Sequence, residues 1–350
     1  MLNLKEYIKE SILDDEEVVF DNVGIKLEIE KFIEDNYSCP QFTISNKPNK
    51  DGKFVVDGTN IQVTNKNITS LTNNLFIWGK IKRDFSCYNC NSLTSLEGAP
   101  EVVGGGFDCS FCRSLETLEG APKEVGRHFN CPYCISLKSL EGAPKKVGKN
   151  FYCYYCNSLK SLKGAPEEMS WDFDCSNCSS LKSLEGAPKK VGGNFDCSHC
   201  KSLKSLEGAS KDVGGYFNCS FCDSLKSLKG APEDVGGDFK CSECKSLKSL
   251  EGAPEKTGSE FDCSNCDSLK SLEGAPKKVG EDFNCSFCKS LTSLEGAPEK
   301  VGGDFKCSLC ISLTSLEGAP EEVDKTFFSI KNKFSVEDIE KVVKAKQIKI

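Results

Sequence analysis

A motif of 22 residues recurs eleven times without a break, and it constrains the fold more than any other feature of the chain. The first copy runs from Phe85 to Gly106 and the last from Phe305 to Thr326, with the consensus F-x-C-x-x-C-x-S-L-x-S-L-x-G-A-P-x-x-V-G-x-x. A unit this short cannot bury its own apolar side, so it must stack on its neighbours. Stacking of this kind extends along one axis and needs no single deep core.

The apolar residues of each copy fall at positions 1, 3, 6, 9, 12, 15 and 19, counted from the phenylalanine. F-x-C alternates as a short strand does, L-x-S-L repeats with a spacing of three, and Gly-Ala-Pro turns the chain. Strands of successive copies then pair in parallel, about 4.8 Å apart. The sequence therefore predicts a β-rich solenoid in which these seven positions face inward.

The chain is expected to consist of four segments. Residues 1–60 form an acidic N-terminal segment with two helices, at 3–13 and 25–36, and short strands after them. Residues 61–84 form a degenerate capping repeat, residues 85–326 the eleven repeats, and residues 327–350 a C-terminal cap with a short helix. Between the two N-terminal helices, residues 14–17 are all acidic and are interpreted as a solvated turn.

The predicted caps carry remnants of the repeat. Upstream, Ile61 and Val63 trace a degenerate copy of F-x-C, and downstream Phe328 and Ile330 echo it. Ser335 to Asp338 then form a helix start of the capping-box kind, with aspartate in place of glutamate. The predicted apolar stripe of that helix consists of Val336, Ile339 and Val343. Such ends hide the last apolar layers of a solenoid.

Charge and hydropathy exclude two classes of partner. Residues 1–60 hold 13 acidic and 7 basic side chains, whereas the rest of the chain holds 39 and 38, so no broad basic face for nucleic acid is expected. No apolar run reaches the roughly 18 residues that a membrane helix needs. Charged residues at 5, 6, 9 and 10 interrupt the N-terminus and argue against a secretory signal. A cytoplasmic protein with reduced cysteines is therefore expected.

The repeat resembles a leucine-rich repeat when it is written from the leucines, as in S-L-K-S-L-E-G-A-P-K-K-V-G-G-N-F-D-C-S-H-C-K-S-L from Ser180 to Leu203. C-x-S-L-x-S-L is similar to the cysteine-containing and BspA-like subclasses, and S-L-E-G-A-P to uncharacterised leucine-rich proteins of bacteriophages and large viruses. The resemblance covers roughly residues 61–330 and departs in length, glycine content and the double cysteine. It implies a curved right-handed solenoid, a leucine-rich-repeat-like parallel β array that binds protein on its strand face. It also places a cysteine where the family often carries a ladder asparagine.

The cysteines suggest two interpretations. The repeats contain 22 of the 23 as C-x-x-C, and two such pairs could supply the four thiolates of a zinc site. Alternatively both are small core residues. The second interpretation is favoured because Val63 and Ile330 stand where the first cysteine belongs in the flanking turns. Disulfides between stacked strands are sterically conceivable but are not expected in a reducing compartment. A zinc- or thiol-based structural or redox module remains the alternative function.

Catalysis has little support, and no cofactor is predicted. The two histidines, His128 and His199, are interpreted as equivalent or near-equivalent surface residues of different repeats, and neither is placed beside an activated cysteine. V-G-G lacks the Lys-Ser/Thr of a phosphate loop. A column of lysines at position 10, with glutamate three residues later, suggests either a docking stripe or a mutually neutralising solvated face, and the second is favoured. The chain is predicted not to be an enzyme.

The best candidates for binding are the variable positions 2, 4 and 5, which flank the inward residues and are expected to face solvent on the strand side. In repeats one to four these positions and the adjoining turns hold Tyr88, Phe111, His128, Tyr133, Tyr152, Tyr154, Tyr155 and Trp171. Clustered exposed aromatics suit a protein interface. Alternatively, strand positions simply tolerate aromatics, or the tyrosines bind carbohydrate. The predicted function is a protein-binding scaffold of unidentified partner and oligomeric state, with Phe221 and Phe287 as more isolated aromatics.

Overall fold

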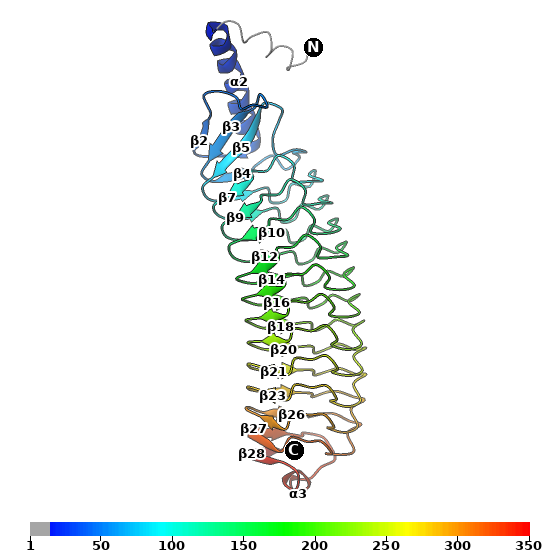
Figure 1. Cartoon of the computed structure of the whole chain (residues 1–350). Helices are drawn as coiled ribbons and strands as arrows, with labels where there is room; N and C mark the ends of the chain where they lie inside the picture. Colours follow the sequence, from blue (N-terminus) through cyan, green and yellow to red (C-terminus); the bar gives the residue numbers. More distant parts are fainter. Residues whose placement is uncertain (1–14) are drawn as a thin grey trace. The chain divides into compact units, whose positions relative to one another are not determined.

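The chain is a β-solenoid, as the repeat predicts. The computed structural model describes residues 15–350, with side chains from Asn22 onward. Two compact units are present, residues 1–148 and residues 149–350, and within each unit successive turns of chain lie one above another (Figure 1). Parallel strands in register join these turns, with each phenylalanine of position 1 opposite that of the next turn. No helix in the described part of the chain is long and apolar enough to span a bilayer.

Each repeat contributes two short strands, whereas the sequence analysis predicts only one. The first strand covers positions 1 and 2, and the second covers positions 18 and 19, where a buried residue follows an exposed one. The first unit contains β6 (Phe85–Ser86), β8 (Phe107–Asp108) and β10 (Phe129–Asn130), and at the second position β7 (Val102–Val103), β9 (Glu124–Val125) and β11 (Lys146–Val147). The sequence predicts no strand at positions 18 and 19, because two strand residues are too few to show alternation.

The second unit contains two ladders of strands at the same positions of the repeat. At positions 1 and 2 lie β12 (Phe151–Tyr152), β14 (Phe173–Asp174), β16 (Phe195–Asp196), β18 (Phe217–Asn218), β20 (Phe239–Lys240), β22 (Phe261–Asp262), β24 (Phe283–Asn284) and β26 (Phe305–Lys306). At positions 18 and 19 lie β13 (Glu168–Met169), β15 (Lys190–Val191), β17 (Asp212–Val213), β19 (Asp234–Val235), β21 (Lys256–Thr257), β23 (Lys278–Val279) and β25 (Lys300–Val301).

The core consists of columns of identical side chains. The residues at positions 1, 3, 6, 9 and 12 are buried throughout the repeats. In the second unit, the neighbouring rings of Phe239 and Phe261 are stacked, with their centroids 5.3 Å apart. Position 15 differs from the prediction, because most of its alanines are half-buried and the proline of position 16 is buried in their place. The preceding glycine has a positive φ, from +77° to +99°, which aims the proline ring inward.

The N-terminal end of the first unit is closed by helix α2 (Asp15–Asn36). Ile29 and Ile33 are fully buried, and the Phe32 ring lies 5.9 Å from that of Phe76. The helix therefore caps the first turns, formed by β1 (Tyr37–Ser38), β2 (Phe42–Ile44), β3 (Phe54–Gly58), β4 (Ile61–Val63) and β5 (Phe76–Ile81). β3 pairs in parallel with β5 and antiparallel with β2.

The acidic turn predicted at residues 14–17 is wrong from residue 15 onward, because α2 begins at Asp15. No glycine or proline occurs between Asp15 and Val23, so the sequence contains nothing that would stop a helix there. The helix predicted at residues 3–13 lies outside the described residues.

The C-terminal end of the second unit is closed by β27 (Glu322–Phe328), β28 (Lys344–Lys349) and α3 (Val336–Glu340). β27 pairs with both β25 and β26, so it joins the two ladders, and β28 pairs in parallel with it. The predicted capping box is confirmed, with Ser335 and Asp338 each accepting from the other's backbone N–H. The apolar stripe is narrower than predicted, because Ile339 and Val343 are buried whereas Val336 is exposed.

The placement of Ile330 is also a correction. Phe327, not Phe328, lies opposite Phe305, so Ser329 takes the place of the first cysteine and is fully buried. Ile330 falls one position later and is exposed. The prediction that Val63 replaces the first cysteine in the upstream turn is confirmed, because Val63 is fully buried in register with the first cysteine of repeat one.

Candidate functional site

The loop that follows each position-1 strand has one unusual residue, at position 5. Its φ lies between +57° and +62° in every turn, the left-handed region that side chains other than asparagine and glycine rarely adopt. Backbone bonds hold it there, as when the Phe221 N–H donates to the Ser242 carbonyl of the next turn at 2.9 Å. The twelve residues are Asn89, Phe111, Tyr133, Tyr155, Asn177, His199, Phe221, Glu243, Asn265, Phe287, Leu309 and Lys331.

Five of these left-handed positions hold phenylalanine or tyrosine. A non-glycine residue in this conformation costs about 1–2 kcal/mol, and asparagine tolerates it best. Several of the rings are also open to solvent, with exposed fractions of 39% for Tyr155, 40% for Phe221 and 46% for Phe287. Neither backbone strain nor exposed apolar area helps the chain to fold, so these rings are candidates for a role in binding.

The predicted aromatics of the first unit lie together. Tyr88, which is 42% exposed, and Phe111 have ring centroids 5.4 Å apart. Phe111 and Tyr133 are stacked with centroids 4.4 Å apart and planes 14° apart. The three rings form one continuous row across successive turns.

The predicted tyrosines of the second unit also lie together. Tyr154 is 6.2 Å from Tyr152 and 6.1 Å from Tyr155 between ring centroids. Tyr152 points outward from β12, and the side-chain amide of Asn150 hydrogen-bonds to its hydroxyl.

The two predicted turn residues behave differently. Trp171 is 52% exposed at position 21, with the Lys149 ammonium 5.6 Å from its ring centroid. His128 is half-buried at position 22, and its carbonyl accepts from the Phe107 N–H at 2.9 Å. His199 instead occupies position 5 and stacks on Phe221 at 4.3 Å. The two histidines are therefore not in equivalent positions, because the repeat places one before a strand and the other after it.

The expectation that position 4 faces solvent is wrong for most repeats. Its residue is a buried serine in six repeats, at Ser110, Ser176, Ser198, Ser220, Ser264 and Ser286, and a half-buried serine in two, at Ser242 and Ser308. The left-handed residue that follows curls the chain, so position 4 packs between turns, as shown by the 3.1 Å contact between the hydroxyls of Ser220 and Ser242.

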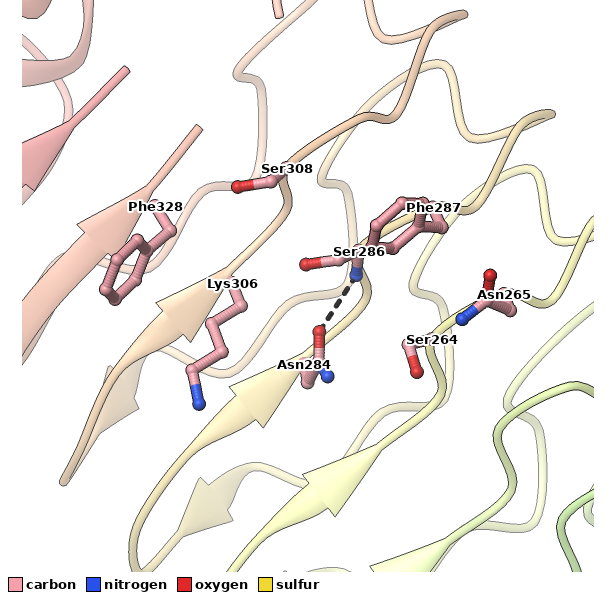
Figure 2. Close-up of a pocket in the computed structure, with 8 residues that line it drawn as sticks. All are labelled: Ser264, Asn265, Asn284, Ser286, Phe287, Lys306, Ser308 and Phe328. Carbon is pink, nitrogen blue, oxygen red and sulfur yellow. Dashed lines mark hydrogen bonds between the residues drawn. The ribbon is translucent and has the colours of Figure 1, made fainter. Parts of the chain in front are cut away.

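The side chain at position 2 supports this curl in six repeats. Asp or Asn there accepts the backbone N–H of position 4, as Asn284 does from Ser286 at 3.1 Å (Figure 2). Phe287 follows this turn and lines a shallow groove of about 230 Å³ with Asn265, Lys306 and Phe328. Sequence reasoning set Phe287 and Phe221 aside as isolated, although their shared position 5 was the signal that links them to the other aromatics.

The cysteines at position 6 form a ladder of thiol hydrogen bonds. In nine repeats the Sγ–H donates to the carbonyl of the position-3 cysteine in the preceding turn, as from Cys244 to Cys219 at 3.2 Å and from Cys266 to Cys241 at 3.2 Å. In the C-terminal cap, Asn332 occupies position 6, and its Nδ2 donates to the Cys307 carbonyl at 2.7 Å. The thiol therefore performs the task of an amide donor, which agrees with the resemblance to an asparagine ladder.

Burial keeps the position-6 cysteines of repeats five to eleven protonated. It raises the pKa of the Cys200 and Cys244 thiols to about 12. In repeats five to eleven every cysteine is a thiol outside any disulfide. Among residues 15–350, no three His, Cys, Asp or Glu side chains are grouped so that they could hold a metal ion. Zinc binds thiolates, so a metal would have to break the ladder.

We therefore expect the protein to retain no stoichiometric zinc when it is purified from zinc-supplemented medium. Native mass spectrometry checks this, with the reduced, chelator-treated chain as the control. A retained mass of one zinc for each pair of repeats would contradict the ladder role and favour the metal module.

Acidic and basic residues are distributed unevenly between the faces of the second unit, which the total charge does not show. Along the position-1 strands, the outward positions 2 and 22 hold eight carboxylates, at Asp172, Asp174, Asp196, Asp238, Glu260, Asp262, Asp282 and Asp304, but only two lysines, Lys240 and Lys306. On the other sides charges pair between turns, as Lys189 does with Glu167 at 3.1 Å. In the column at position 10, Lys138 pairs with Glu116 of the preceding turn rather than with a residue three positions later. The expected neutralisation does not extend along the column, because no ion pair within residues 22–350 involves Lys160, Lys182, Lys204, Lys226, Lys248 or Lys270.

The comparisons with known proteins add little. No family model matches the chain, and no curated protein matches it. A leucine-rich repeat protein from Bacteroides ovatus, known from its crystal structure, is 17% identical; the match covers 89% of this chain and 99% of that one, with a TM-score of 0.34.

Proposed function

We propose that this chain is a non-enzymatic scaffold that holds a partner protein on the strand side of its repeats. The observation that supports this is the set of aromatic rings on left-handed residues, three of which, on Tyr155, Phe221 and Phe287, are also exposed, so that both the backbone strain and the exposure oppose folding. Large rigid rings supply most of the energy of protein interfaces. The S-L-E-G-A-P repeats suggest a phage or viral origin, and the protonated thiol ladder suits the reducing cytoplasm of a host cell.

Site-specific photo-crosslinking tests this proposal. A benzophenone amino acid is placed singly at Phe111, Tyr155 or Phe221, and at the exposed Lys204 on another side of the repeats as the control. We expect the three strand-side positions to crosslink the same protein in a lysate of the native host, and position 204 to crosslink none. Equal crosslinking from position 204 would reject the strand side as the interface.

A second prediction separates binding from folding. Changing Phe111, Tyr133 and Tyr155 together to asparagine should leave the chain folded, because Asn89, Asn177 and Asn265 already occupy the same left-handed position. We expect stability to rise by about 0.5–1 kcal/mol for each change, as asparagine relieves the strain. Capture of the crosslinked partner should fall at least tenfold, measured by quantitative pull-down beside thermal unfolding. Unchanged capture by the stable variant would contradict the proposal.

A further inference from the structure

The outward face of strands β12, β14, β16 and β18 gathers two tyrosines and three carboxylates. Tyr152, Asp174 and Asp196 lie side by side because their strands pair in register. Asp172 and Tyr216 each precede a strand by one residue, so they share this face as the second row. We call these five residues the carboxylate patch, and all of them belong to the second unit.

The hydrogen bonds of the patch do not require its charge. Asp174 and Asp196 accept the N–H of Ser176 and Ser198, each at 2.8 Å. Asn218 performs the same task in the next turn, where it accepts from Ser220 at 3.0 Å. In the other row, Asp172 accepts the Asn194 N–H at 2.8 Å, and Asn194 in turn accepts the Tyr216 N–H at 3.0 Å. An amide therefore serves these turns as well as a carboxylate does. The one bond that asparagine would lose is the 3.2 Å bond that the Asn218 side-chain amide donates to the second oxygen of Asp196.

The charge is also unfavourable for the folded chain. Burial, and then the neighbouring carboxylates of Asp196 and Asp172, raise the pKa of Asp174 to about 6. Burial and the same carboxylates raise the pKa of Tyr216 to about 12. Like charges on adjacent strands repel each other. The patch thus keeps a negative charge that neither its hydrogen bonds nor its stability calls for.

Two ion pairs in later repeats show which chemical group the same face contacts within the chain. In later repeats, Lys306 occupies position 2, and its ammonium contacts Asp282 at 2.5 Å. Lys240 occupies the same position two repeats after Asp196 and contacts Asp238 at 3.0 Å. No ion pair within residues 22–350 involves Asp172, Asp174 or Asp196. The two rows therefore bind an ammonium group where the sequence supplies one, and the carboxylate patch has none of its own.

We propose that the carboxylate patch binds a lysine- or arginine-bearing segment of the partner protein. This rests on the proposed scaffold function and names the chemistry of what the scaffold holds. The carboxylates complement the cationic side chain, and the rings of Tyr152 and Tyr216 offer faces on which its alkyl stem and charge can lie. Charge complementarity of this kind selects the partner and fixes its register.

Fluorescence anisotropy tests this with a short labelled peptide in which lysine and glycine alternate, added to the full chain. We expect saturable binding at low salt that weakens at least tenfold in the Asp174→Asn/Asp196→Asn variant. The variant keeps the turn hydrogen bonds, as Asn218 shows. The matched control, Glu207→Gln/Glu273→Gln, removes the same charge from exposed residues on another side and should bind as the wild type does. Binding should also weaken between about pH 7.5 and pH 5, as Asp174 becomes protonated.

Three results would overturn the proposal. Equal weakening by both double variants would show unspecific attraction to net charge, and equal binding of a peptide with glutamine in place of lysine would exclude cation recognition. A scaffold that still crosslinks its partner through Phe111 and Tyr155 while ignoring the lysine peptide would refute this inference and leave the scaffold function standing.

Discussion

Asp174→Asn should stabilise the second unit by about 3 kcal/mol near pH 7, one of the two largest effects that the structure predicts. A pKa raised from its ordinary 3.8 to about 6 means that the folded state disfavours the ionised carboxylate by this amount. The folded chain therefore binds the proton more tightly than the unfolded chain does. The stabilising contribution is fully present below about pH 3.8 and is lost as the pH rises through about 6. Asparagine removes the titration and keeps the bond to the Ser176 N–H.

Urea unfolding followed by circular dichroism, at about pH 4 and pH 7, measures this effect. The gain of the variant over the wild type should be large at pH 7 and small at pH 4, because Asp174 is already protonated in the folded wild type at pH 4. The other carboxylates titrate in both proteins and cancel in the difference. Glu207→Gln, an exposed change elsewhere on the repeats, should shift stability by less than about 0.5 kcal/mol. A loss of stability at pH 7 in the Asp174 variant would show that its charge is favourable in the fold.

Cys222→Val should destabilise the same unit by about 1–3 kcal/mol, although valine is the more apolar residue. The Cys222 thiol donates to the Cys197 carbonyl at 3.4 Å, and valine leaves that buried acceptor without its donor. If the cysteines were merely small core residues, valine would cost little, as Val63 shows at position 3 of the cap. The prediction therefore distinguishes the two cysteines of each repeat.

Cys222→Ser is the matched variant, because a hydroxyl of nearly the same size retains the donor. Serine should be less destabilising than valine at Cys222, and the order should reverse at Cys219, whose side chain packs at position 3. Denaturant midpoints of the four variants are the measurement. The same order at both positions would contradict a ladder role for position 6.

The sequence predicts the fold well because its period is strict. A phenylalanine, two cysteines and two leucines at fixed spacing leave one arrangement in which all are buried, and register then follows from identity between turns. The predicted register is wrong where the 22-residue repeat becomes irregular. Phe327-Phe328 permits two registers that differ by one residue, and only the pairing of Phe327 with Phe305 places Ser329 inside and Ile330 outside.

Only part of the candidate site can be predicted from the sequence. The aromatics stand out because they interrupt a repeated pattern, and that is how Tyr88 and Tyr155 are found. The left-handed conformation of position 5 depends on hydrogen bonds between turns, so no spacing within one repeat reveals it. The carboxylate patch cannot be seen in the sequence, because the near-neutral total charge averages over all faces of the repeats. Only the register of β14 and β16 shows which charged residues share one face.

The left-handed residue has a consequence for how such a protein changes over generations. Hydrogen bonds between turns fix the backbone there whichever side chain it carries, from Glu243 to Leu309. In the proposed scaffold, recognition and folding therefore depend on different positions of the same repeat. A single substitution can alter one element of the proposed binding surface without disturbing the layers beneath, and duplication of a repeat adds one further element to that surface.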